Sequence, residues 1–221
     1  MALGQASPKR SVKRLLDRIK RKPPSSGVAE DTGFFSSVYQ EPPDSPQTLT
    51  AWKDRAAQIG AQPVDRKAAS DTFGRLWGAD RHVVALTAEE LNRMSQYLEF
   101  VQVPAAQEVI AQDELGDYMV IVLEGTLSVD RGHSWGGKTR LAEAHAGDML
   151  GEMSLLDAGA RFSSCATLTP CLLAVVEAKR LDEMITQEPR LGVALLASLS
   201  RRLSLRLRQV SARLSALLSQ N

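Results

Sequence analysis

The residue types best suited to binding chemistry are concentrated between positions 147 and 167. Gly151 would let the backbone approach a ligand closely, and the first amides of a turn that starts at Glu152 could bind an anion. Arg161 could hold the same anion through charge-assisted, bidentate hydrogen bonds. A carboxylate at Glu152 suits a ligand that offers hydroxyl groups as well as negative charge. A ribose phosphate has both.

The sequence also allows or predicts other roles for its reactive residues. Glu152 and Arg161 could instead form a structural ion pair with no ligand, because charges in clefts are often structural. Cys165 and Cys171 lack a CxxC or histidine-rich context, so we expect small buried residues and not redox sensors. The three histidines lack metal-ligand spacing, so no metal or haem site and no cofactor is expected. A metal enzyme of the cupin type would need a cluster of histidines and carboxylates, and the chain is predicted not to be an enzyme.

The segments around this site alternate apolar and polar residues with a period of two. Short strands separated by Gly- and Asp-containing turns are typical of a sandwich, jelly roll or barrel. The expected fold is mainly β with flanking helices: a double-stranded β-helix (jelly roll or β-roll) with N-terminal helices and a long C-terminal helix. The expected strands are 98–103, 108–111, 118–123, 126–130, 140–144, 164–168 and 172–176.

Helical periodicity flanks the strands. Thr87 and Glu90 have the spacing of a capping box ahead of an apolar run, which predicts a helix over 87–97. Two more helices are predicted over 178–185 and 190–218.

The segment Gly151-Glu152-Met153-Ser154-Leu155-Leu156, followed by a short loop and Arg161, resembles the phosphate-binding cassette of cyclic-nucleotide-binding domains. This family includes bacterial catabolite activators, regulatory subunits of cyclic-AMP-dependent protein kinase and gated channels. Residues 109–125 resemble the second and third strands of the family with their glycine turn. The resemblance covers about residues 82–210.

The resemblance implies roles for individual residues. Glu152 would bind the ribose 2′-hydroxyl, Arg161 the cyclic phosphate, and Gly151 and Met153 would contribute backbone groups. Family members usually have a small or hydroxyl residue after the arginine, whereas this chain has Phe162, so Ser163 would substitute or Phe162 would narrow the pocket. Cyclic AMP is the first candidate ligand and cyclic GMP the second. The candidate ligand-binding residues are Gly151, Glu152, Met153, Ser154, Arg161, Phe162 and Ser163.

The last helix carries apolar residues at spacings of three and four. One interpretation is a homodimer seam along its second half; the other is a single helix that covers its own domain. In related regulators this helix also closes on the base, which makes Ser198 and Arg202 candidates for a lid. The apolar positions are Leu196, Leu199, Leu203, Leu207, Val210, Leu214 and Leu217.

Charge divides the chain into segments. Residues 1–22 hold eight Lys or Arg and one acid, and six arginines but no acid follow Glu188. The expected organisation is a basic amphipathic segment (1–22), a disordered linker (23–49), a helical lead-in (50–80), the cyclic-nucleotide-binding β-roll with its C-terminal helices (81–210), and the end of the last helix or a tail (211–221). The basic segment could be a solvated tail, a weak anchor to anionic membranes or a docking segment for an acidic partner.

The sequence therefore predicts a sensor that binds a cyclic nucleotide and relays it through its C-terminal helices to an unknown protein partner. The alternative is a degenerate β-roll that serves as a dimerisation or scaffold module without a small ligand. Too few residues follow the last helix for a helix-turn-helix module, so sequence-specific DNA binding is not expected. No apolar run is long enough for a membrane span and the N-terminus is charged, which predicts a cytoplasmic protein.

Overall fold

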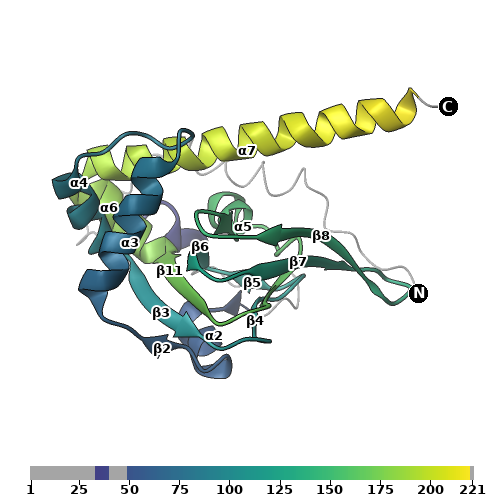
Figure 1. The fold of residues 1–221 in the computed structure, drawn as a ribbon, viewed down its shortest axis with the longest axis horizontal. Coiled ribbons are helices and arrows are strands. Elements are labelled where there is room, and N and C mark those ends of the chain that lie inside the picture. Colours follow the sequence, from purple (N-terminus) through teal and green to yellow (C-terminus); the bar gives the residue numbers. More distant parts are fainter. Residues whose placement is uncertain (1–32, 40–48, 220–221) are drawn as a thin grey trace, which may run out of the picture.

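The computed structural model describes residues 33–39 and 49–219, and it confirms the expected fold class. A β-roll is flanked by helices, and one long helix runs from it at the C-terminal end (Figure 1). The helices are η1 (Ser36–Tyr39), α2 (Trp52–Gln58), α3 (Arg66–Ala79), α4 (Ala88–Ser95), α5 (Glu152–Asp157), α6 (Ala178–Gln187) and α7 (Pro189–Leu218). The strands are β1 (Leu49–Thr50), β2 (Gln62–Pro63), β3 (Glu99–Val103), β4 (Glu108–Ile110), β5 (Leu115–Gly116), β6 (Tyr118–Glu124), β7 (Leu127–Gly132), β8 (Lys138–Ala144), β9 (Met149–Leu150), β10 (Ser164–Thr167) and β11 (Cys171–Glu177).

Two sheets form the roll, one of four strands in the order β4-β10-β7-β8 and one of five in the order β2-β3-β11-β6-β9. Strand β6 is buried on both faces, because alternate side chains point to opposite sides of a sheet. Val120 and Val122 pack in the cluster inside the roll. Met119 and Ile121 pack in a second cluster beneath the helices. Strand β6 thus contributes side chains both to the inside of the roll and to its contact with the helices.

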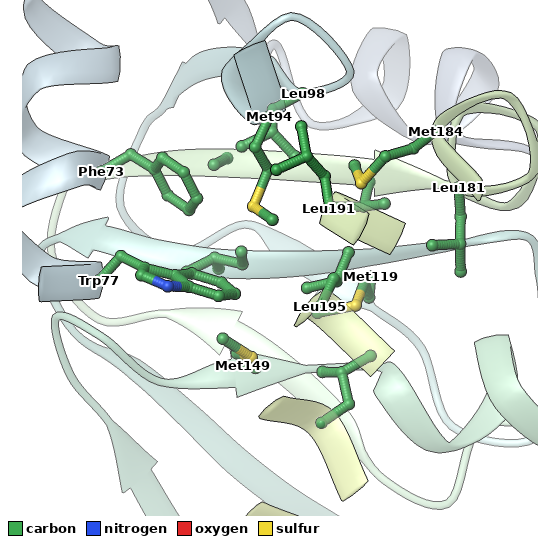
Figure 2. Close-up of a cluster of buried hydrophobic side chains, with 14 of the residues drawn as sticks. Phe73, Trp77, Met94, Leu98, Met119, Met149, Leu181, Met184, Leu191 and Leu195 are labelled. Carbon is green, nitrogen blue, oxygen red and sulfur yellow. The ribbon is translucent and has the colours of Figure 1, made fainter. Parts of the chain in front are cut away.

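The helical layer contributes most of the larger side chains of the second cluster. Figure 2 shows Phe73 and Trp77 on α3 and Met94 on α4 close to Leu191 and Leu195 on α7. All five are buried, and they cover one face of the five-stranded sheet with branched and unbranched apolar groups. The first third of α7 is therefore a fixed part of the domain core.

The second half of α7 leaves the roll. From residue 204 to its end every residue of α7 is exposed, and Figure 1 shows this part of the helix running above the sheets, on the side of α5 and β8. This observation agrees with the expected long C-terminal helix, and it leaves an apolar stripe without cover in the part of the chain that the structure describes.

The N-terminal part differs from the sequence interpretation. Residues 33–39 were expected within a disordered linker, but they form η1 and place Phe35 in the core at 8% exposure. The helical lead-in, whose pattern Gly60 and Pro63 interrupt in the sequence, forms α2 and α3, which are separated by Gly60 with a φ of 64° and by strand β2. A single buried aromatic residue in a polar segment gives no periodic pattern, so the burial of Phe35 was not predicted from the sequence. The basic segment 1–22 lies outside the described residues.

The predicted capping box at the start of α4 is confirmed, and it has a measurable consequence. A hydrogen bond from the Thr87 amide and another from Arg190 lower the pKa of Glu90 from 4.5 to about 2. Because the folded-state pKa lies below the unfolded one, this stabilisation is complete above about pH 4.5 and is lost as the pH falls toward 2. We expect Glu90→Gln to lower the unfolding temperature at pH 7 and the difference from wild type to shrink between pH 4.5 and 2.

Thermal unfolding at a series of pH values tests this expectation. Glu89→Gln is the matched control, because Glu89 is exposed and, among the described residues, pairs with Arg93 on the same helix. A difference between wild type and Glu90→Gln that does not change with pH would contradict the assignment.

Candidate functional site

Arg161 lies at the centre of the candidate site as a buried cation. Its side chain is 3% exposed, Nη1 donates to the carbonyl of Gly151 at 2.8 Å, and Nη2 donates to the carbonyl of Tyr118 at 2.6 Å. The guanidinium also lies 4.7 Å from the centre of the Tyr118 ring. Within the described residues its hydrogen bonds go to neutral groups and not to a carboxylate. A buried charge with only neutral partners is costly, so an anion beside it would be stabilising.

Two glycines make room for this guanidinium. Gly151 precedes α5 with a φ of 81°, and a Cβ there would lie 2.7 Å from Nη1 of Arg161. Gly116, on β5, faces the other side, where a Cβ would lie 2.5 Å from Nη2. Any larger residue at either position would displace the arginine. Only the first of these glycines was singled out from the sequence.

Glu152 does not pair with Arg161, so the structural ion pair considered from the sequence is not formed. Its buried carboxylate instead accepts from Nη1 of Arg206 on α7, with Nη1 and Oε1 2.6 Å apart. The Arg206 side chain is half exposed. The carboxylate expected to bind ribose is thus occupied by a cation from the last helix.

The two lid residues expected from the sequence have other partners. Ser198 is fully buried, where its hydroxyl accepts from the amide of Val84 and donates to the carbonyl of Ala194. Arg202 pairs with Asp80, and its Nη1 lies 3.8 Å from Oδ1 of Asp148, three residues before Gly151. The residue of α7 that reaches the cassette itself is Arg206, one turn beyond Arg202.

The remaining candidates differ in burial. Ser154 is buried, and its carbonyl accepts from the hydroxyl of Tyr39 at 2.7 Å. Met153 is exposed on α5 and Ser163 is partly buried. Phe162 is 53% exposed and stacks on Arg131, whose guanidinium carbon is 4.2 Å from the ring centre. Phe162 therefore contacts the neighbouring strand β7 instead of filling the space around Arg161.

Both cysteines of the domain are buried. Burial raises the pKa of the Cys165 thiol to about 12, in spite of the opposing charge of Arg161, so the thiol stays protonated at neutral pH. Cys171 is also buried, and burial raises the pKa of its thiol. Over residues 33–39 and 49–219, no cluster of three or more His, Cys, Asp or Glu residues could hold a metal ion. No helix in these ranges is long and apolar enough to cross a membrane.

The sequence found the residues that are contiguous in the cassette and missed those brought to it from elsewhere. Tyr118, Gly116 and Tyr39 surround Arg161 or α5 but lie 33 residues or more before Gly151 along the chain. Arg206 has one sequence signal, because it follows Arg202 by four residues and so shares its helix face. The other three carry no pattern that separates them from ordinary strand, turn or linker residues.

Comparisons with known proteins show what this part of the chain is similar to. Residues 100–188 match the family model described as "Cyclic nucleotide-binding domain". The chain is 31% identical over 110 residues to a CRP-like cAMP-activated global transcriptional regulator of Mycobacterium tuberculosis, covering 50% of this chain and 49% of that protein. It is 30% identical over 118 residues to a cyclic AMP receptor protein of Thermus thermophilus, covering 53% of this chain and 55% of that protein. The chain spans about half the length of these curated relatives.

Solved structures show the same fold. A cyclic nucleotide-binding domain from Methylobacillus flagellatus is similar with a TM-score of 0.61 and 23% identity, over 69% of this chain and 85% of that one. The Thermus thermophilus catabolite activator protein is similar with a TM-score of 0.54 and 28% identity, over 60% of this chain and 61% of that one.

Proposed function

We propose that the chain, which contains a cyclic nucleotide-binding domain of the CRP-like kind, is a non-enzymatic sensor that binds a cyclic nucleotide at residues 151–163. Cyclic AMP is the first candidate, since both curated relatives carry it in their names, and cyclic GMP is the second. The proposed compartment is the cytoplasm. The similarity to this family supports the ligand class, and the chemistry of the residues described above supports the choice of site.

The observation that carries the proposal is the buried guanidinium of Arg161 with only neutral hydrogen-bond acceptors in the described part of the chain. A cyclic phosphate would supply the missing negative charge. The first backbone amides of α5, which have no partner within the helix, would add donors on the side of Gly151. Glu152 would accept from a ribose hydroxyl, a role that suits a buried carboxylate next to a phosphate site.

The ion pair between Glu152 and Arg206 supports a relay through α7. A ribose hydroxyl and Arg206 would compete for the same carboxylate. Binding would then release this contact and change the position of the exposed half of α7, which is the part available to a partner. A ligand shifts such an equilibrium by its difference in affinity for the two arrangements.

A thermal-shift titration tests the proposal directly. We expect cyclic AMP, and more weakly cyclic GMP, to raise the unfolding temperature with a concentration dependence set by binding linkage, about 2.7 kcal/mol at a hundred-fold excess over Kd. Linear AMP is the control, because it has the same base and ribose without the cyclic phosphate. Cyclic dinucleotides belong in the same screen. No shift with any of these ligands at millimolar concentration would contradict the sensor proposal.

One observation favours a second function, a dimerisation or scaffold module without a ligand. The distal half of α7 exposes an apolar stripe that nothing covers in the described part of the chain. A negative titration together with a stable dimer would favour this module over the sensor. A positive titration leaves the stripe as the output surface of the sensor, with a second copy as the proposed partner.

A further inference from the structure

Residues 33–39 and 49–58, called here the N-terminal strap, contact the elements that hold Arg161. The first contact is made by Tyr39, whose hydroxyl donates to the carbonyl of Ser154 on α5 at 2.7 Å. Burial raises the pKa of Tyr39, and the positive charge of Arg161 opposes that rise. Tyr39 therefore interacts electrostatically with Arg161, and it is hydrogen-bonded to α5 of the candidate cassette.

The second contact is a short parallel strand pair. Thr50 on β1 is paired with Gly116 on β5. Gly116 is the residue whose missing side chain leaves room for Nη2 of Arg161. Contacts with both the roll and the strap therefore fix the position of β5 relative to the guanidinium.

The third contact is aromatic. Trp52 is 2% exposed, and its ring centre lies 5.1 Å from that of Tyr118. Tyr118 in turn lies under the guanidinium and supplies the carbonyl that accepts from Nη2. The Trp52 amide also donates to Asp117, a carboxylate near Arg161 whose pKa is raised by burial and lowered by that arginine.

The strap is anchored at a point outside the cassette. The buried carboxylate of Asp182 on α6 accepts from the amides of Phe35 and Ser36 at 2.8 and 2.7 Å. Phe35 is also buried in the core beside α6. One end of the strap is thus held by α6, while Tyr39, Thr50 and Trp52 reach α5, β5 and β6.

From this arrangement we infer that the strap positions Arg161 for its ligand and is itself held more tightly when a cyclic phosphate is bound. The inference rests on the proposed function. The strap makes three separate contacts, with α5, Gly116 and Tyr118. Each of these lies next to the guanidinium or next to a group that hydrogen-bonds it. Coupling between two sites is reciprocal, so the factor by which the strap strengthens binding equals the factor by which the ligand stabilises the docked strap. Tyr39 and Trp52 are positioning residues in this scheme.

The test uses the full chain, cyclic AMP and the variant Tyr39→Phe, which removes one hydroxyl and keeps the ring. Calorimetry measures the Kd, and amide hydrogen exchange follows Phe35 and Ser36 with and without saturating cyclic AMP. We expect cyclic AMP to slow exchange at these amides about five-fold or more, and Tyr39→Phe to weaken binding by a similar factor, which is a usual size for coupling between sites. The control is Tyr97→Phe, which removes a tyrosine hydroxyl that bonds Gln187, remote from Arg161 in sequence and bonding.

The outcomes separate the inference from the function on which it rests. The inference would be supported if cyclic AMP slows exchange at the strap amides in wild type. It also requires that Tyr39→Phe binds cyclic AMP more weakly than wild type while Tyr97→Phe does not. Normal cyclic AMP binding with unchanged strap exchange and an unchanged Kd in Tyr39→Phe would overturn it and leave the sensor proposal intact. Failure of wild type to bind cyclic AMP, cyclic GMP or a cyclic dinucleotide would overturn both. A double variant with Arg161→Lys adds a further check, because a positioning role predicts that the two losses do not add.

Discussion

Replacement of Arg161 by alanine is expected to weaken cyclic AMP binding at least about 30-fold, because losing one partner of a buried, hydrogen-bonded charge pair costs about 2 to 5 kcal/mol. The substitution removes the guanidinium that lies against both Gly151 and Gly116. Calorimetric titration of the purified variant measures the loss. Arg161→Lys keeps the charge and is expected to bind with intermediate affinity, because an ammonium group cannot bond a phosphate and two carbonyls with the same geometry.

Arg206→Ala is the matched control with an expected effect of opposite sign. It also removes one arginine close to the cassette, but this arginine occupies the Glu152 carboxylate that the ribose would need. We expect unchanged or tighter cyclic AMP binding in this variant. Since Arg161 also bonds two backbone carbonyls, far-UV circular dichroism must first show that Arg161→Ala is folded. Equal affinity in wild type and a folded Arg161→Ala would refute the assignment of the site.

The second large effect is expected on α7. Leu207, Val210, Leu214 and Leu217 are 55 to 67% exposed, and their alternating spacing of three and four matches a coiled-coil seam. The double variant Leu207→Asp/Leu214→Asp is expected to be monomeric at concentrations where wild type is dimeric. Loss of a buried leucine costs about 2 to 5 kcal/mol, and a buried carboxylate adds to that cost. Sedimentation equilibrium measures the oligomeric state.

Gln209→Asp/Ala216→Asp provides the matched control for the α7 variant. These positions are also seven residues apart on the exposed part of α7 but outside the apolar stripe, so the same two charges and the same loss of helix propensity are introduced. This variant is expected to remain dimeric. A monomeric wild type, or a dimer that survives the two leucine substitutions, would show that the stripe has another use.

Some of the site could be read from the chain directly, because its residues are close together in sequence. Gly151, Glu152 and Arg161 lie within eleven residues, so a local pattern places them on one turn and loop whatever the rest of the fold does. The same holds for the capping box of Thr87 and Glu90, which needs only a helix start to form. Strands such as β6 and β11 were likewise visible, since each contains six apolar residues in a row.

Short elements and long-range partners could not be read in this way. Strands β1, β2, β5 and β9 contain two residues each, too few for a period of two to be recognised. Phe35 is a single apolar contact in a polar segment, and its amide is held by Asp182, 147 residues away. No local propensity encodes such a contact.

The sequence by itself therefore determined the β-roll, the long last helix and the three central residues of the candidate cassette, because periodicity and contiguous motifs are local properties. Only the tertiary structure decided what those residues touch. It separated Glu152 from Arg161, gave Glu152 the cation of Arg206, and enclosed Arg161 between two glycines and Tyr118. The physical reason is that burial and pairing depend on which distant segments the two sheets and the helical layer bring together, and that choice is made by packing of the whole chain.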